Sequence, residues 1–129
     1  MRAEGSALLS MELIACVPKD LVDLLPAFLP HRQAEVIRLR AALAARDWAR
    51  IRDVAERMLA LGNPYGFRQI TTFGRLMRKA GAEQNELALI DLIGAYADYL
   101  SKVAVIEVDV PSFAKALEED ASEGRNGNS

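Results

Sequence analysis

Few side chains in this sequence of 129 residues could act as nucleophiles or metal ligands. It has one histidine, His31, and one cysteine, Cys16, which are far apart and belong to no pair at i, i+3 or i, i+4. Zinc sites and Cys–His nucleophiles need several such groups to converge, so we expect no metal or other cofactor. His31, beside Arg32 at an expected helix start, is interpreted as a solvated residue. Cys16, in apolar surroundings, is interpreted as a buried or incidental thiol.

The composition limits the class of protein. Hydrophobic residues make up 51% of the chain, which is enough for one domain with a real core. The net charge of −2 argues against binding through neutralisation of nucleic-acid phosphates. The apolar stretch 7–17 is interrupted by Glu12 and precedes no small-residue cleavage site, and no run is long enough to span a membrane. We therefore expect a cytoplasmic protein with no membrane contact.

Hydrophobic spacing and breaker residues predict mainly helices. A short helix from Pro18 should bend or restart near Pro30, because proline removes a backbone donor. The expected main helices cover about 31–45, 48–62 with Asp47 as N-cap, 67–80 ended by Gly81, and 83–105. Residues 11–17 fit either a strand or a helix start, 106–110 fit a short strand, and 112–120 fit a last short helix.

The apolar faces of these helices predict the core. The expected inward residues are Val36, Leu39, Ala42 and Leu43; Ile51, Val54, Ala55, Met58 and Gly62; Phe67, Ile70, Phe73, Gly74 and Met77; and Leu89, Ile90, Ile93, Tyr96, Ala97 and Leu100. Short connections between amphipathic helices favour an all-α, antiparallel four-helix bundle with a short additional N-terminal helix. Its expected parts are an N-terminal extension (1–17), the bundle (18–105) and an acidic, largely flexible C-terminal tail (106–129).

Charge is distributed unevenly along the chain. Residues 46–79 carry eight basic and three acidic side chains, a net charge of +5, whereas the whole chain carries −2. Residues after Val105 are rich in aspartate and glutamate. The basic segment is either a surface that attracts an acidic protein partner or an ordinary solvated helix face.

The segment Ala55–Phe67, AERMLALGNPYGF, resembles the phosphotransfer signature of the histidine phosphotransfer (Hpt) domain family. That signature commonly reads A-H-x-L-K-G-x-x-x-x-Y/F-G-F. The preceding RAALAARDWARIRDV and the following FRQITTFGRLMRKA also resemble the helices on either side, and FLPHR resembles the start of the family's second helix. The resemblance spans roughly residues 17–105 and implies a bundle of Hpt type.

The resemblance fails at the residues that carry the family's chemistry. In the family a histidine takes a phosphoryl group from a partner's aspartate, a lysine one turn on holds its charge, and a glycine lets the partner approach. Glu56, Leu59 and Ala60 occupy these three positions here, whereas Ala55 and Tyr65–Phe67 match. A carboxylate is anionic at pH 7 and repels an incoming phosphoryl group, so we expect no enzyme activity.

The resemblance implies a non-catalytic Hpt-like module of two-component (phosphorelay) signalling. It would dock on a response-regulator receiver domain or a histidine kinase, as a monomer or weak dimer. Glu56 is then either a neutral loss or a fixed negative charge, and Leu59 either packs on the next helix or extends an apolar patch. The expected docking residues are Arg52, Glu56, Leu59, Ala60 and Asn63, with Arg57 and Arg68 at the rim.

Two alternatives remain at the level of sequence. One is an active phosphotransfer protein that uses an atypical residue. The other is a structural or oligomerising helical bundle that resembles the family only in its architecture.

Overall fold

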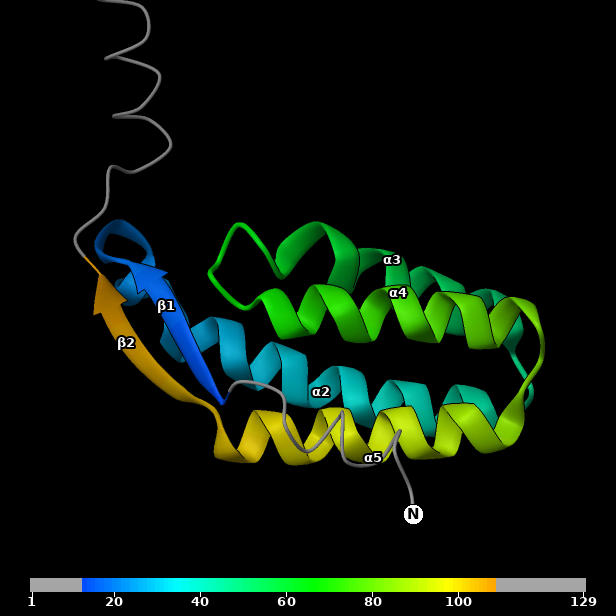
Figure 1. Cartoon of the computed structure of the whole chain (residues 1–129). Helices are drawn as coiled ribbons and strands as arrows, with labels where there is room; N and C mark the ends of the chain where they lie inside the picture. Colours follow the sequence, from blue (N-terminus) through cyan, green and yellow to red (C-terminus); the bar gives the residue numbers. More distant parts are fainter. Residues whose placement is uncertain (1–12, 109–129) are drawn as a thin grey trace, which may run out of the picture.

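The computed structural model describes residues 13–108 (Figure 1). Along the chain the elements are β1 (Ile14–Pro18), the 3-10 helix η1 (Lys19–Leu24), α2 (Leu25–Ala44), α3 (Trp48–Leu61), α4 (Arg68–Ala82), α5 (Glu86–Lys102) and β2 (Ala104–Val108). The described part is therefore mostly helical, with four main helices as expected. The all-α expectation omitted the small sheet that β1 and β2 form.

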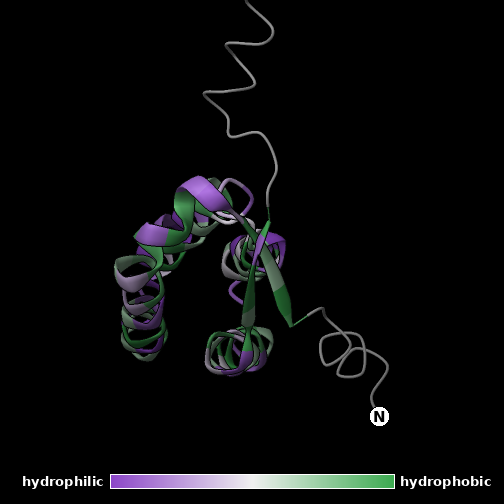
Figure 2. Cartoon of the chain, turned by 90° about the vertical axis from the view of Figure 1, so that its left-hand side faces the viewer, coloured by the Kyte–Doolittle hydropathy of each residue, from purple (hydrophilic) through white to green (hydrophobic). Residues whose placement is uncertain are grey.

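The four main helices contact one another in a closed order. α3 packs along α4, α4 contacts α5, α5 contacts α2, and α2 contacts α3. Figure 1 shows α3 and α4 in one layer and α2 and α5 in the other, and Figure 2 shows the same helices from the end that carries the strands. None of the helices in residues 13–108 combines the length and apolar character that crossing a membrane requires.

α2 differs from the prediction because it runs through Pro30 without restarting. Proline in a helix removes the hydrogen bond from its own nitrogen to the carbonyl four residues earlier. Here that carbonyl belongs to Pro26, near the start of α2, so α2 loses one helical hydrogen bond at this end and continues for fourteen more residues after Pro30. The predicted helices 18–30 and 31–45 are therefore η1 followed by a single helix.

Two predicted boundaries near the turn between α4 and α5 are also wrong. Gly81 lies inside α4, which ends at Ala82. A Cβ at Gly81 would be 3.2 Å from the Ile51 side chain, so this glycine permits close packing and does not terminate the helix. α5 begins later than expected, because the Asn85 side chain accepts a hydrogen bond from the Ala88 backbone and acts as the N-cap.

β1 and β2 pair in parallel, with Ile14 opposite Ala104 and Cys16 opposite Ile106. The expected domain boundaries at 17/18 and 105/106 therefore fall inside these two strands. Residues 13–17 thus include a strand, one of the two alternatives for this segment. Cys16 is exposed on β1, so the interpretation of a buried thiol is wrong. The predicted helix at 112–120 and the end of the predicted strand at 106–110 lie outside the described residues.

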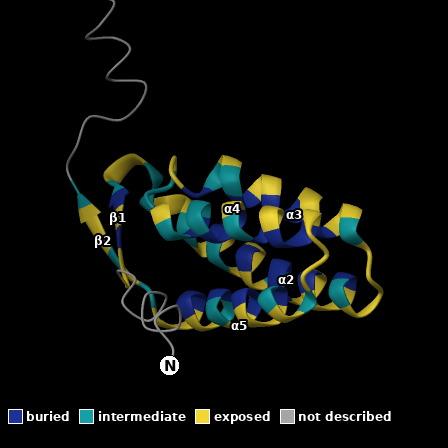
Figure 3. Ribbon diagram, turned by 45° about the vertical axis from the view of Figure 1, so that its right-hand side comes forward, coloured by how far each residue is buried: buried dark blue, intermediate teal, exposed yellow. Residues whose placement is uncertain are grey.

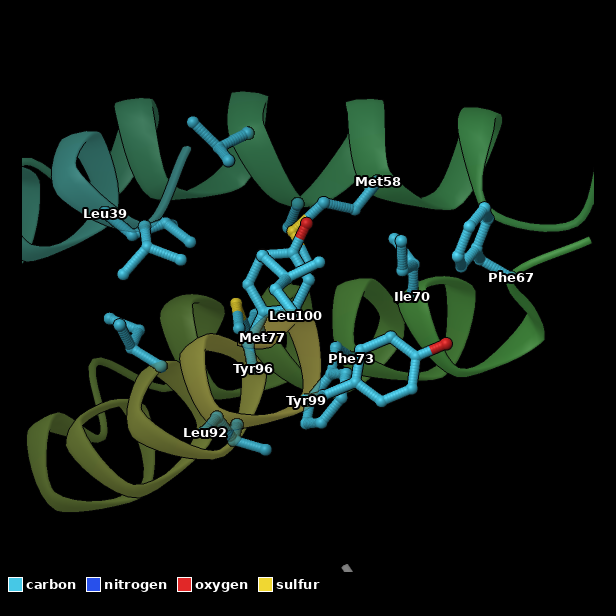
Figure 4. Packing of buried hydrophobic residues seen from close by; sticks show 14 of the residues in the cluster. Leu39, Met58, Phe67, Ile70, Phe73, Met77, Leu92, Tyr96, Tyr99 and Leu100 are labelled. Atoms are coloured by element: carbon cyan, nitrogen blue, oxygen red, sulfur yellow. The ribbon is translucent and has the colours of Figure 1, made fainter. Parts of the chain in front are cut away.

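The core lies where the inner faces of the four helices meet, and buried residues line these faces in Figure 3. Figure 4 shows its aromatic centre, where the Phe73 ring lies 5.5 Å from Tyr96 and 5.9 Å from Tyr99 between ring centroids. The predicted inward residues of α3 and α4 are all buried. On α5 the prediction fails at Ile90, which is exposed, because the buried stripe there passes through Leu92 and Tyr99 instead.

Candidate functional site

α3 carries Glu56, the residue that the sequence resemblance aligns with the phosphoacceptor of Hpt domains. The Asp47 side chain accepts a hydrogen bond from the Arg50 backbone and so fixes the start of this helix. The buried residues Ile51, Val54 and Met58 form its inner face. At about 100° per residue, Glu56 points to the opposite side of the helix, and it is exposed.

The expected docking residues of α3 gather around Glu56. Arg52, Leu59 and Ala60 lie within about 60° of Glu56 on the helix. Arg52 and Ala60 are exposed, and Leu59 is half-buried beside α4. We call this surface the Glu56 face and define it by Arg52, Glu56, Leu59, Ala60 and Asn63.

The two expected rim residues lie on different helices. Burial raises the pKa of Glu35 on α2, and the charge of Arg57, which is exposed on α3, is among the minor influences that oppose this increase. Arg68 is exposed and opens α4. The structure therefore places Arg52, Glu56, Leu59 and Ala60 on one side of α3, with Asn63 in the turn after the helix and Arg68 at the start of α4.

Small residues allow α3 and α4 to lie close together. A Cβ at Gly74 of α4 would come within 2.8 Å of the Ala55 carbonyl oxygen and 3.1 Å of the Leu59 backbone nitrogen. A Cβ at Gly62 would clash with the Thr71 side chain and backbone. The hairpin thus presents the outer surfaces of two helices as one continuous surface, with Leu59 beside the contact.

The turn between α3 and α4 is held in place by the residues that match the end of the family motif. The Phe28 ring of α2 stacks on Tyr65, with 4.2 Å between ring centroids, and on Phe67, with 5.2 Å. Gly66 has a φ of +87° and lies directly against the Cys16 carbonyl of β1. The Tyr65–Phe67 segment therefore fixes the hairpin to α2 and to the sheet.

Electrostatically, the surface of the α3–α4 hairpin is basic around the exposed carboxylate of Glu56. No ion pair within residues 13–108 involves Glu56. Arg52 is 3.9 Å from the Asp53 carboxylate, a long and exposed contact that contributes little to stability. Within the described residues Glu56 is therefore exposed and outside any ion pair, and Arg52 makes only this long contact.

A buried polar cluster, which the sequence analysis did not identify, links α2 to α5. Glu35 is fully buried, and its Oε1 lies 3.1 Å from Arg32 Nε and accepts a hydrogen bond of 3.0 Å from the Tyr96 hydroxyl. The Arg32 guanidinium also lies over the Phe28 ring, 4.9 Å from its centroid. Burial raises the pKa of Glu35, and Arg32 and Tyr96 partly oppose this increase. The i, i+3 spacing of Arg32 and Glu35 was the available signal, although it usually marks an exposed pair.

A pocket of about 250 Å³ lies at the far end of the hairpin, where α3 begins and α4 ends. Trp48, Ala49, Gly81 and Ala82 form its mostly apolar surface, and Arg52 and Arg78 line it as well. Arg52 belongs to both the pocket and the Glu56 face. The concentration of basic residues and the chain's single tryptophan were the sequence signals for this region.

The five residues that define the Glu56 face include no histidine, cysteine or lysine. His31 is exposed on α2, a different helix. No group of three or more potential metal ligands is found within residues 13–108. The face offers a guanidinium, a carboxylate, an isobutyl group, a methyl group and an amide.

Comparisons with known proteins returned no match: no family model, no curated protein and no solved structure resembles the chain significantly.

Proposed function

We propose that this chain is a non-catalytic Hpt-like interaction module of two-component signalling, which docks on a receiver domain or histidine kinase through the Glu56 face. The observation that carries the proposal is the place of Glu56, Leu59 and Ala60. They lie together on the outer side of α3, and the Tyr65–Phe67 turn that follows this helix packs on α2 and β1. The closed order of helix contacts supports a four-helix bundle of Hpt type as the fold of this module.

The proposed module does not carry phosphate. An imidazole can attack a phosphoryl group as a neutral nucleophile, whereas the exposed carboxylate of Glu56 is anionic at neutral pH and repels it. Leu59 supplies no cation to hold phosphoryl charge. What remains is a convex, partly apolar surface with arginines at its margins, which can compete for a partner or hold it in place.

Docking is tested with the full chain and purified receiver and kinase domains from its native host. We expect at least one of them to bind, and Ala60→Arg to weaken that binding at least about tenfold, because the new side chain separates the two surfaces. Ala41→Arg is the matched control, since Ala41 is exposed on α2, outside the Glu56 face. Equal binding by both variants, or no binding partner among the receivers and kinases, contradicts the proposal.

The absence of catalysis is tested separately. The full chain is incubated with an autophosphorylating kinase and with a phosphorylated receiver, and label on the chain is measured. We expect none. Acid-labile label that disappears in His31→Ala would establish instead the alternative of phosphotransfer through an atypical residue.

An exposed apolar stripe on α5 favours a second function, association of two copies. Leu87 is 76% exposed and Ile90 is 55% exposed, and they share a helical face with Gly94. A Cβ at Gly94 would meet nothing within 4 Å, so a partner helix could approach closely there. This stripe is on α5, which is across the molecule from α3, so such a dimer leaves the Glu56 face free.

We expect light scattering to show a weak, concentration-dependent dimer that Ile90→Glu abolishes, because a charge at this position would have to be buried on association. Arg75→Glu changes an exposed residue on α4 and is the control for charge alone. A parent chain that stays monomeric at high concentration rules out this second function.

A further inference from the structure

The pocket between the start of α3 and the end of α4 has the chemistry of a binding site for an acidic peptide. Its apolar surface includes the half-buried Trp48 and the small residues Gly81 and Ala82. Arg52 and Arg78 provide two positive charges, and no acidic residue lines the pocket. In residues 13–108 Arg78 takes part in no ion pair. A suitable ligand therefore combines an apolar side chain with neighbouring carboxylates.

The chain itself contains a segment of this chemistry. Residues 109–129 carry five acidic and two basic side chains, a net charge of −3, opposite to the +5 of residues 46–79. Within this segment the apolar residues Phe113 and Leu117 precede the run Glu118–Asp120. The order of an apolar side chain followed by three carboxylates matches a pocket with an apolar surface and two arginines.

The segment is long enough to reach the pocket. It begins after β2, and β2 lies at the other end of the hairpin, because Cys16 pairs with Ile106 and also contacts Gly66 in the turn after α3. α3 has 14 residues, so the pocket lies about 21 Å from that turn along the helix. Ten extended residues from Val108 to Glu118 span about 33 Å. Leu117 and the acidic run can therefore reach Trp48 without strain.

We propose that residues 109–129 fold back along the α3–α4 hairpin, with Leu117 against Trp48 and Glu118–Asp120 beside Arg52 and Arg78. Tethering gives the segment an effective local concentration in the millimolar range, so weak contacts suffice for occupancy. Because Arg52 also belongs to the Glu56 face, the bound segment competes with any acidic partner there. The proposal itself concerns only this chain and does not depend on the proposed function.

The test uses the fluorescence of Trp48, the chain's single tryptophan, in the full chain without any partner. The variant Glu118→Gln/Glu119→Gln/Asp120→Asn removes the negative charges and should release the segment. We expect quenching of Trp48 by acrylamide, a neutral quencher, to increase about twofold on release. Raising NaCl to about 1 M, where the Debye length is about 3 Å, should produce the same increase in the parent and none in the variant.

Two further variants locate the contact. Leu117→Ser and Arg78→Gln should each increase quenching in the same way, whereas Arg40→Gln, an exposed arginine on α2, should not. Equal quenching of the parent and the triple variant would overturn the proposal. So would protection of Trp48 that appears only when a separate acidic protein is added, because the occupant would then come from a partner.

Discussion

The variant Gly66→Ala is expected to lower the free energy of unfolding by about 3 kcal/mol, combining the cost of a left-handed backbone with that of a steric clash. Gly66 has a φ of +87°, which a residue with a Cβ adopts only at a cost. The added Cβ would also lie on the Cys16 carbonyl of β1. Relief requires the turn or the strand to move, and either movement disturbs the stacking of Phe28 on Tyr65 and Phe67.

Gly94→Ala provides the matched control in a urea or thermal unfolding experiment, performed at a concentration at which the chain is monomeric. Gly94 is exposed in the interior of α5, and a Cβ there meets no atom within 4 Å. Alanine is the better helix former, so this variant should be more stable than the parent by about 0.5–1 kcal/mol. If Gly66→Ala unfolds like the parent, the packing of the turn on β1 is not what holds the hairpin in place.

The second large effect concerns the buried cluster of Arg32, Glu35 and Tyr96. We expect Arg32→Met to lower the free energy of unfolding by about 3 kcal/mol at pH 7, because it leaves the carboxylate of Glu35 buried without a counter-charge. The double variant Arg32→Met/Glu35→Gln should recover much of this loss, since the amide carbonyl can still accept the hydrogen bond from Tyr96. A double variant no more stable than Arg32→Met would show that the ion pair is not the source of the effect.

The pH dependence of these variants has a defined sign. Burial raises the pKa of Glu35 above its usual 4.5 in the folded chain. The folded state therefore holds this proton more tightly than the unfolded state does. The stability contributed by protonated Glu35 is fully present below about pH 4.5 and is lost as the pH rises through the raised pKa. Compared with Glu35→Gln, the parent should lose stability over this range, and Arg32→Met should lose more, because Arg32 is the main group that opposes the increase.

The hydrophobic pattern predicted the four main helices and most of their inner faces, because burial on one side of a helix leaves a regular trace in the sequence. Local signals failed where tertiary packing decided the outcome. Pro30 was expected to interrupt a helix, but α2 continues through it. Gly81 was expected to end a helix, but Ile51 packs against it instead. For Gly81 the deciding contact, with Ile51, lies outside the sequence window in which the signal was seen.

The residues of the candidate site could likewise be predicted only in part from the sequence. Spacing alone placed Arg52, Glu56 and Ala60 on one side of α3, and they share its outer face. The pocket lined by Trp48 and Arg78 could not be predicted from helical spacing. Its walls come from two helices, and the distance between them depends on Gly74 and Gly81. The burial of Glu35 was also missed, because only its partners on α2 and α5 make a charged residue acceptable there.

The parallel pairing of β1 with β2 has a mechanical consequence. Tension applied between residues 13 and 108 would pull the start of one strand away from the end of the other, along the strand axes. In this geometry the hydrogen bonds of the ladder are loaded together in shear and do not open one at a time. The short sheet therefore acts as a clamp on the chain, and a force between its two ends would have to break this clamp before it reached the helices.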